Sequence, residues 1–144
     1  MRITSPPDVA VRLRLAITRT SRRLRQEAGS GLSPTLTAAL ATIDRHGPLT
    51  PSELAQRERV QRPTVTRLVA RLEELGLLAR AADPGDRRSS LLSITPAGRA
   101  LLEEVRGRKD AYLAGRLEGL DAEERAALDR AAAILERLLE DDRA

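Results

Sequence analysis

The chain has 144 residues, which suit one compact domain and leave no room for a second enzymatic unit. It contains one tyrosine and no phenylalanine or tryptophan, so its core must come mainly from leucine and alanine, which favour helix over sheet. It has no cysteine and one histidine, which excludes disulfides and thiolate metal sites and nearly excludes zinc. No apolar stretch is long enough to span a membrane, and charges interrupt any N-terminal signal core. We therefore expect an α-rich, cytoplasmic protein with no membrane partner.

The net charge of +4 is distributed unevenly along the chain. Residues 1–32 carry a net +5 and residues 57–88 a net +3, whereas residues 118–144 carry −5. Of the 25 basic residues 24 are arginine, whose planar guanidinium suits phosphate and guanine edges. A GC-rich genome enriches arginine as well, so the arginine content alone does not decide between nucleic-acid binding and codon bias.

Proline and glycine divide the chain into helices. Serine or threonine precedes proline at Ser33-Pro34, Thr50-Pro51 and Thr95-Pro96. In such pairs the hydroxyl can cap free N–H groups, while proline occupies the first helical position, where it loses no hydrogen bond. Together with glycine stops and apolar periodicity, these signals predict helices over about residues 8–28, 34–45, 51–58, 63–75, 96–116 and 122–140.

A β-hairpin is predicted between the fourth and fifth of these helices. Two short runs, residues 77–82 and 89–94, flank the sequence Asp83-Pro84-Gly85-Asp86. Proline at the second turn position and glycine at the third favour a type II turn, because glycine tolerates the positive φ required there. Arg87 and Arg88 follow the turn and give the hairpin a charged tip.

The helices over 51–58 and 63–75, joined by a short connection around Val60, form a helix-turn-helix, and the hairpin makes it winged. Free N–H groups at the start of the second helix favour a phosphate. Thr66 either contacts DNA or bonds back to its own helix, and Arg87 and Arg88 can reach a minor groove or the flanking backbone. The side chains available for base edges or phosphates in the first turns are Gln61, Arg62, Thr64 and Arg67.

Five sequence segments, taken together, are specific enough to indicate a protein family. They are LTPSELA at 49–55, RPTVTRLV at 62–69, LEELGL at 72–77, DPGDRR at 83–88 and LSITPAGR at 92–99. In them the sequence resembles the MarR family of bacterial winged-helix regulators, over nearly the whole chain. The resemblance implies an obligate homodimer whose terminal helices pair and whose wings straddle DNA. It also implies repression that is relieved by a small phenolic or anionic ligand, although no effector-binding residue is assigned.

The resemblance also assigns roles within the wing. It places the two acidic residues of the family's wing signature at Asp83 and Asp86, where they support the wing, and the groove-entering arginine at Arg88. The chain departs from the family at Gly85, where a basic residue is common, and at Gln61, where a serine cap is often found.

These features predict a mainly α fold with a small β-hairpin wing, in one domain over 1–144. Residues 33–94 form the winged-helix DNA-binding core, and 1–32 with 95–144 form a helical dimerisation region, because one subunit cannot cover the leucines of 128–139. We expect a transcriptional regulator that binds double-stranded DNA in a sequence-specific way. Its two recognition helices would lie about 34 Å apart on a near-palindromic operator.

Other classes of function fit less well. An enzyme is disfavoured, since Asp44 and His46 are neighbours only in sequence and Gly29-Ser30-Gly31 lacks the strand and spacing of a phosphate loop. No cofactor and no metal are expected, and single-stranded nucleic acid would need stacking aromatics that the chain lacks. Two alternatives stay open: a winged-helix protein-interaction module, and a non-specific architectural DNA binder with a strong salt dependence and little sequence preference.

Overall fold

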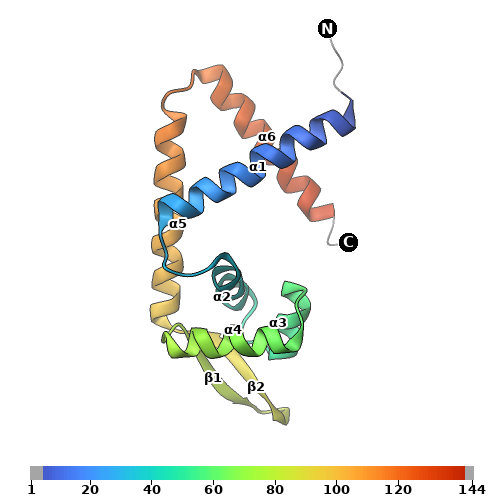
Figure 1. The fold of residues 1–144 in the computed structure, drawn as a ribbon, viewed down its shortest axis with the longest axis vertical. Coiled ribbons are helices and arrows are strands. Elements are labelled where there is room, and N and C mark those ends of the chain that lie inside the picture. Colours follow the sequence, from blue (N-terminus) through green and yellow to red (C-terminus); the bar gives the residue numbers. More distant parts are fainter. Residues whose placement is uncertain (1–4, 142–144) are drawn as a thin grey trace.

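The computed structural model describes residues 5–141, which form six helices and one antiparallel hairpin (Figure 1). The mainly α fold class with a small hairpin is thereby confirmed. Residues 1–4 and 142–144, which the predicted dimerisation region includes, lie outside the described residues. The elements are α1 (Pro6–Ala28), α2 (Pro34–His46), α3 (Pro51–Glu58), α4 (Arg62–Glu74), β1 (Leu78–Asp83), β2 (Asp86–Ile94), α5 (Pro96–Leu117) and α6 (Ala122–Asp141).

The helix starts predicted at Ser-Pro and Thr-Pro pairs are confirmed for α2, α3 and α5. The side chains of Ser33, Thr50 and Thr95 each accept a hydrogen bond from the backbone N–H three residues later, at 3.1–3.2 Å. The first helix begins in a related way at Ser5-Pro6, two residues before its predicted start. There the Ser5 hydroxyl donates to the Asp8 carboxylate at 2.5 Å and makes no cap hydrogen bond.

The lower half of the molecule in Figure 1, which we call the winged lobe, comprises α2, α3, α4 and the hairpin, residues 34–94. A two-way backbone bridge between Leu49 and Leu92, at 3.1 and 2.7 Å, ties β2 to the loop after α2. The lobe therefore has a continuous apolar core. Its largest fully buried side chains are Leu40, Ile43, Leu49, Leu54, Val65, Val69, Leu72 and Leu92.

The start of α5 holds the hairpin against the lobe. Thr95 donates through its hydroxyl to the carbonyl of Gly76 at 2.7 Å and through its backbone N–H to the carbonyl of Leu77 at 3.1 Å. Gly98 is buried at this contact, where a Cβ would lie 2.3 Å from the Leu77 carbonyl oxygen. Only glycine allows so close an approach, so the wing is fixed relative to α4.

The turn of the hairpin differs from its prediction. The strands pair from Leu78 with Ile94 to Ala82 with Ser90, and the register then shifts so that Asp83 opposes Asp86. Gly85 lacks the positive φ that a type II turn requires, so that prediction is wrong. Instead the Asp83 carboxylate accepts the Gly85 N–H at 2.9 Å, which closes the turn by a side chain.

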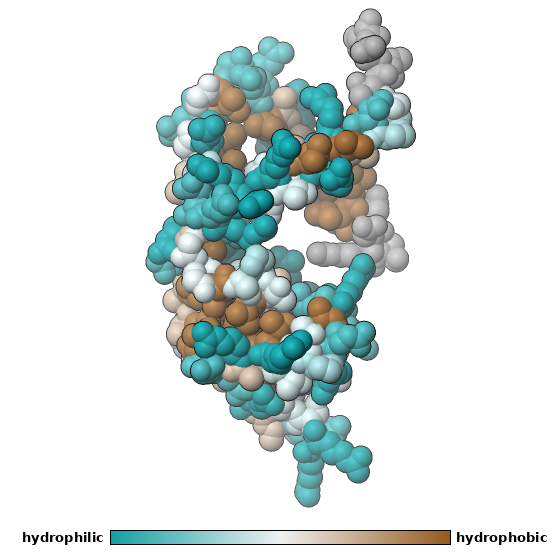
Figure 2. Space-filling model, viewed as in Figure 1, coloured by the Kyte–Doolittle hydropathy of each residue, from teal (hydrophilic) through white to brown (hydrophobic). Residues whose placement is uncertain are grey.

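The upper half of the molecule has a different construction. In Figure 1, α5 rises out of the winged lobe, α6 turns back from its far end, and α1 runs obliquely from α5. Between residues 122 and 140 of α6 no side chain is fully buried, and brown patches mark apolar side chains on these helices in Figure 2. The large apolar residues left exposed on α1 and α6 are Val9, Val11, Leu13, Leu15, Ile17, Leu128, Ile134, Leu138 and Leu139.

Polar contacts attach α1 to α5. The Arg23 Nε donates to the Tyr112 hydroxyl at 3.1 Å, with the guanidinium carbon 5.8 Å from the ring centroid. This hydrogen bond raises the pKa of Arg23 above its ordinary value. Arg108 donates to the carbonyl of Ala28 at 2.8 Å and so satisfies the last carbonyl of α1.

Candidate DNA-binding surface

The first turns of α4 offer polar side chains and free backbone donors on one surface. Gln61 occupies the N-cap position and its side chain makes no cap hydrogen bond, so these N–H groups remain available to an anion. Val65, Val69 and Leu72 pack into the core, which directs the remaining faces outward. Thr64 is half-buried, while the exposed members of the predicted set in α4 and at its cap are Gln61, Arg62, Thr66 and Arg67.

Two of these residues have specific hydrogen bonds. Arg62 donates from Nη1 to the hydroxyl of Ser52 on α3 at 2.5 Å. Thr66 donates its hydroxyl to the Arg62 carbonyl at 3.1 Å, which is the back-bonded arrangement considered from the sequence. Because the hydroxyl proton is used, Thr66 can only accept a hydrogen bond from a partner outside the chain.

Arg87 and Arg88 lie in β2, beside the tip of the hairpin, and both are exposed. The Asp86 carboxylate accepts the backbone N–H of Arg88 at 2.9 Å, and the Asp83 carboxylate closes the turn. Both acidic side chains therefore hold the wing backbone and pair with neither guanidinium group. Hydrophilic side chains project from this end of the molecule in Figure 2.

The charge of these arginines is not neutralised by any side chain that the structure describes. In residues 5–141, Arg67, Arg87 and Arg88 have no ion-pair partner, and Arg62 contacts a neutral hydroxyl. Both α4 and the wing lie at the lower end of the molecule (Figure 1). By contrast, several other arginines form ion pairs, namely Arg71 with Glu74, Arg80 with Glu73, and both Arg99 and Arg106 with Asp44.

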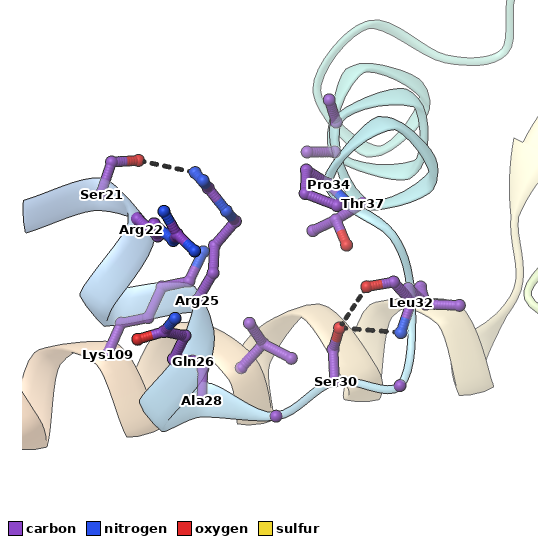
Figure 3. A pocket seen from close by; sticks show the side chains of 15 residues that line it. Ser21, Arg22, Arg25, Gln26, Ala28, Ser30, Leu32, Pro34, Thr37 and Lys109 are labelled. Carbon is purple, nitrogen blue, oxygen red and sulfur yellow. Dashed lines mark hydrogen bonds between the residues drawn. The ribbon is translucent and has the colours of Figure 1, made fainter. Parts of the chain in front are cut away.

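A second feature is a cavity of about 570 Å³ between the end of α1, the start of α2 and α5. We call it the linker cavity, because residues 29–32, which join α1 to α2, form one wall. Figure 3 shows Arg22, Arg25 and Lys109 on its α1 and α5 side, with Pro34 and Thr37 facing them from α2. The sequence did not identify this site, although the net charge of +5 in residues 1–32 was a signal for it.

Other kinds of site are not found in the part of the chain that the structure describes. Between residues 5 and 141, no three histidine or acidic side chains are grouped so that they could hold a metal ion. None of the helices in that range has both the length and the apolar character needed to cross a membrane.

Comparison with known proteins places the chain in a family. The model described as MarR family matches residues 32–90. The HTH-type transcriptional regulator MT0903.1 of Mycobacterium tuberculosis is 36% identical over 140 residues, which cover 96% of this chain and 98% of that protein. The chain belongs to the MarR family. It is therefore a DNA-binding transcriptional regulator of the MarR type, a class whose members are not enzymes.

Solved structures agree with this assignment. A putative transcriptional regulator of Pseudomonas aeruginosa has a TM-score of 0.82 and 36% identity, covering 92% of this chain and 94% of that chain. A MarR family protein of Bacillus stearothermophilus has a TM-score of 0.79 and 26% identity, covering 96% of this chain and 99% of that chain. The winged helix-turn-helix is thus shared by this MarR regulator and its structural neighbours.

Proposed function

We propose that this MarR regulator is a homodimeric repressor that recognises a near-palindromic operator. The observation that carries the proposal is the group of exposed arginines, unpaired within residues 5–141, that lies beside the free N-terminus of α4 and on the wing. Repression is supported by MdtR of Bacillus subtilis, named a transcriptional repressor, which is 38% identical over 94 residues, 65% of this chain and 61% of that protein.

Each subunit places α4 in a major groove and its wing in the adjacent minor groove or on the flanking backbone. Residues 33–94 serve as the DNA-binding core, and 1–32 with 95–144 as the dimerisation region. The exposed apolar residues of α1 and α6 support this division, because an isolated subunit leaves them in water. A twofold partner covers them and sets two recognition helices about one DNA turn, 34 Å, apart.

The roles of the arginines and threonines can be separated by their effects on sequence preference. Arg88→Ala weakens binding to many duplexes by a similar factor and lowers the salt slope by about one, because the lost charge interacts without reading bases. Thr64→Ala or Arg62→Ala shifts the preferred bases, at a cost of about 1–3 kcal/mol on the best operator. Selection of bound duplexes from a random pool, at fixed salt, measures both effects.

Arg116→Ala is the matched control, because it removes an exposed arginine near the end of α5, outside the winged lobe. It should leave the selected sequences unchanged. A uniform loss on every duplex for all three site variants would contradict the proposed roles. Recovery of duplexes without any consensus would favour an architectural DNA binder, and recovery of no duplex would favour a protein-interaction module.

The linker cavity supports a response to a small anionic aromatic effector. Arg22, Arg25 and Lys109 supply positive charge, while Val105 and Ala41 supply apolar surface. Because the cavity is lined by α1 and by α2, a ligand there contacts both halves of the subunit. Such a ligand releases the operator only if it prefers a dimer geometry in which the recognition helices are wrongly spaced.

Lys109→Met tests the charge of this cavity, since methionine keeps the apolar stem and removes the ammonium group. We expect about tenfold weaker binding of 2-hydroxybenzoate, because a charge-assisted hydrogen bond contributes about 1.5–3 kcal/mol. Isothermal titration calorimetry measures the affinity, with Arg116→Ala as the control. Equal affinity of the two variants, or equally tight binding of neutral benzyl alcohol, would rule out anion recognition in this cavity.

A further inference from the structure

The hydroxyl of Ser52 has a partner that the helix-capping pattern does not explain. Thr50 caps α3 by accepting the Glu53 N–H at 3.2 Å, so Ser52 is not needed to begin the helix. Ser52 is exposed in the first turn of α3, and its oxygen accepts a hydrogen bond from Arg62 at the first position of α4. The contact therefore joins the beginnings of the two helices of the helix-turn-helix.

This contact orients a cation without neutralising it. A guanidinium has five N–H donors, and the bond to Ser52 uses one of them. A carboxylate in place of the serine would cancel the charge, as Glu74 does for Arg71. A neutral hydroxyl leaves the charge and the remaining donors for an outside acceptor, and it restricts a side chain that otherwise has many rotamers.

We infer that Ser52 is a positioning residue for Arg62 and, through it, a determinant of operator preference. The inference rests on the proposed role of Arg62 in base recognition. A base edge is recognised only when donors meet it at a defined angle, whereas a phosphate accepts donors from many directions. Arg67, which has no partner in the described chain, lacks this restraint, so the two exposed arginines of α4 are held differently.

Ser52→Ala should reduce the preference for the operator over a scrambled duplex by about threefold to tenfold. Without the Ser52 contact, the Arg62 side chain loses its conformational freedom only when the variant binds, which weakens binding to the operator. Ser52→Thr keeps the hydroxyl and restores most of the preference. Fluorescence anisotropy with both duplexes gives the ratio, and thermal unfolding should be unchanged because the Thr50 cap is intact.

Ser5→Ala provides a matched control. Ser5, at the start of α1, donates its hydroxyl to the Asp8 carboxylate at 2.5 Å, so an exposed contact between a serine hydroxyl and a charged side chain is removed outside the winged lobe and away from the linker cavity. This variant should keep the full operator preference. If Ser5→Ala and Ser52→Ala lowered the preference equally, the effect would not depend on Arg62 and the inference would be overturned.

A double-mutant cycle separates the two levels of the proposal. Once Arg62 is alanine, adding Ser52→Ala should change the preference no further, because the positioned group is absent. Additive losses, or an equal loss on both duplexes for Ser52→Ala, would overturn the role of Ser52 alone. If Arg62→Ala left the preference intact, the proposed base recognition by Arg62 would itself be wrong.

Discussion

Leu138→Glu on α6 is expected to convert the proposed homodimer into monomers and to lower operator affinity at least about 100-fold. Leu138 is 58% exposed in one subunit, so the subunit's own core does not cover it, and the proposed partner does. A glutamate there places an unpaired charge in an apolar interface. Loss of the dimer removes the second half-site contact, and linked binding exceeds single-site affinity by about 10²–10⁴.

Sedimentation velocity at micromolar concentration and an operator titration measure the two effects. Arg137→Glu is the control, because it introduces the same residue at the neighbouring position, about 100° around the helix. It should remain dimeric and keep its affinity for the operator. A wild-type chain that sediments as a monomer, or a dimeric Leu138→Glu variant with full affinity, would contradict the proposed assembly.

Leu92→Ala in β2 is expected to lower the free energy of unfolding by about 2–5 kcal/mol, the usual effect of truncating a buried leucine. Leu92 is fully buried, and its backbone forms the two-way bridge to Leu49. The variant therefore leaves a cavity at the point where the wing is attached to the lobe. Urea denaturation followed by circular dichroism measures the loss.

Leu91→Ala is the matched control for this prediction. Leu91 precedes Leu92 in the same strand, points to the other face and is only half-buried. We expect a loss of about 1 kcal/mol or less, because water already reaches the side chain. Equal losses for the two leucines would show that the core does not extend under the wing as the burial of Leu92 indicates.

Local signals made the helices predictable from the sequence. Ser-Pro and Thr-Pro starts together with glycine stops gave boundaries within two residues of those observed, because capping depends on neighbours in sequence. The turn type was mispredicted because the hydrogen bond that the Asp83 carboxylate accepts from the Gly85 N–H decided the conformation, and the preference of Gly85 for positive φ did not. A rule based on two turn residues cannot include that contact.

The candidate site was only partly predictable. The periodicity of α4 identified which of its faces is exposed, and so gave Arg62 and Arg67 as solvent-facing residues. It could not give the contact of Arg62 with Ser52, because that bond depends on the angle between two helices and on one rotamer. The linker cavity was beyond sequence patterns for a similar reason, since Gln26 and Lys109 come together only in the folded chain.

The two halves of the subunit differ in what keeps them ordered. The winged lobe contains its own buried core, whereas α6 has no fully buried residue in the range 122–140, where its burial is described. In the proposed homodimer, the folding of α6 is coupled to association, so its stability depends on subunit concentration. Dilution then unfolds α6 while the winged lobe stays folded. The amount of protein that a cell makes therefore helps to determine how much of each chain is folded.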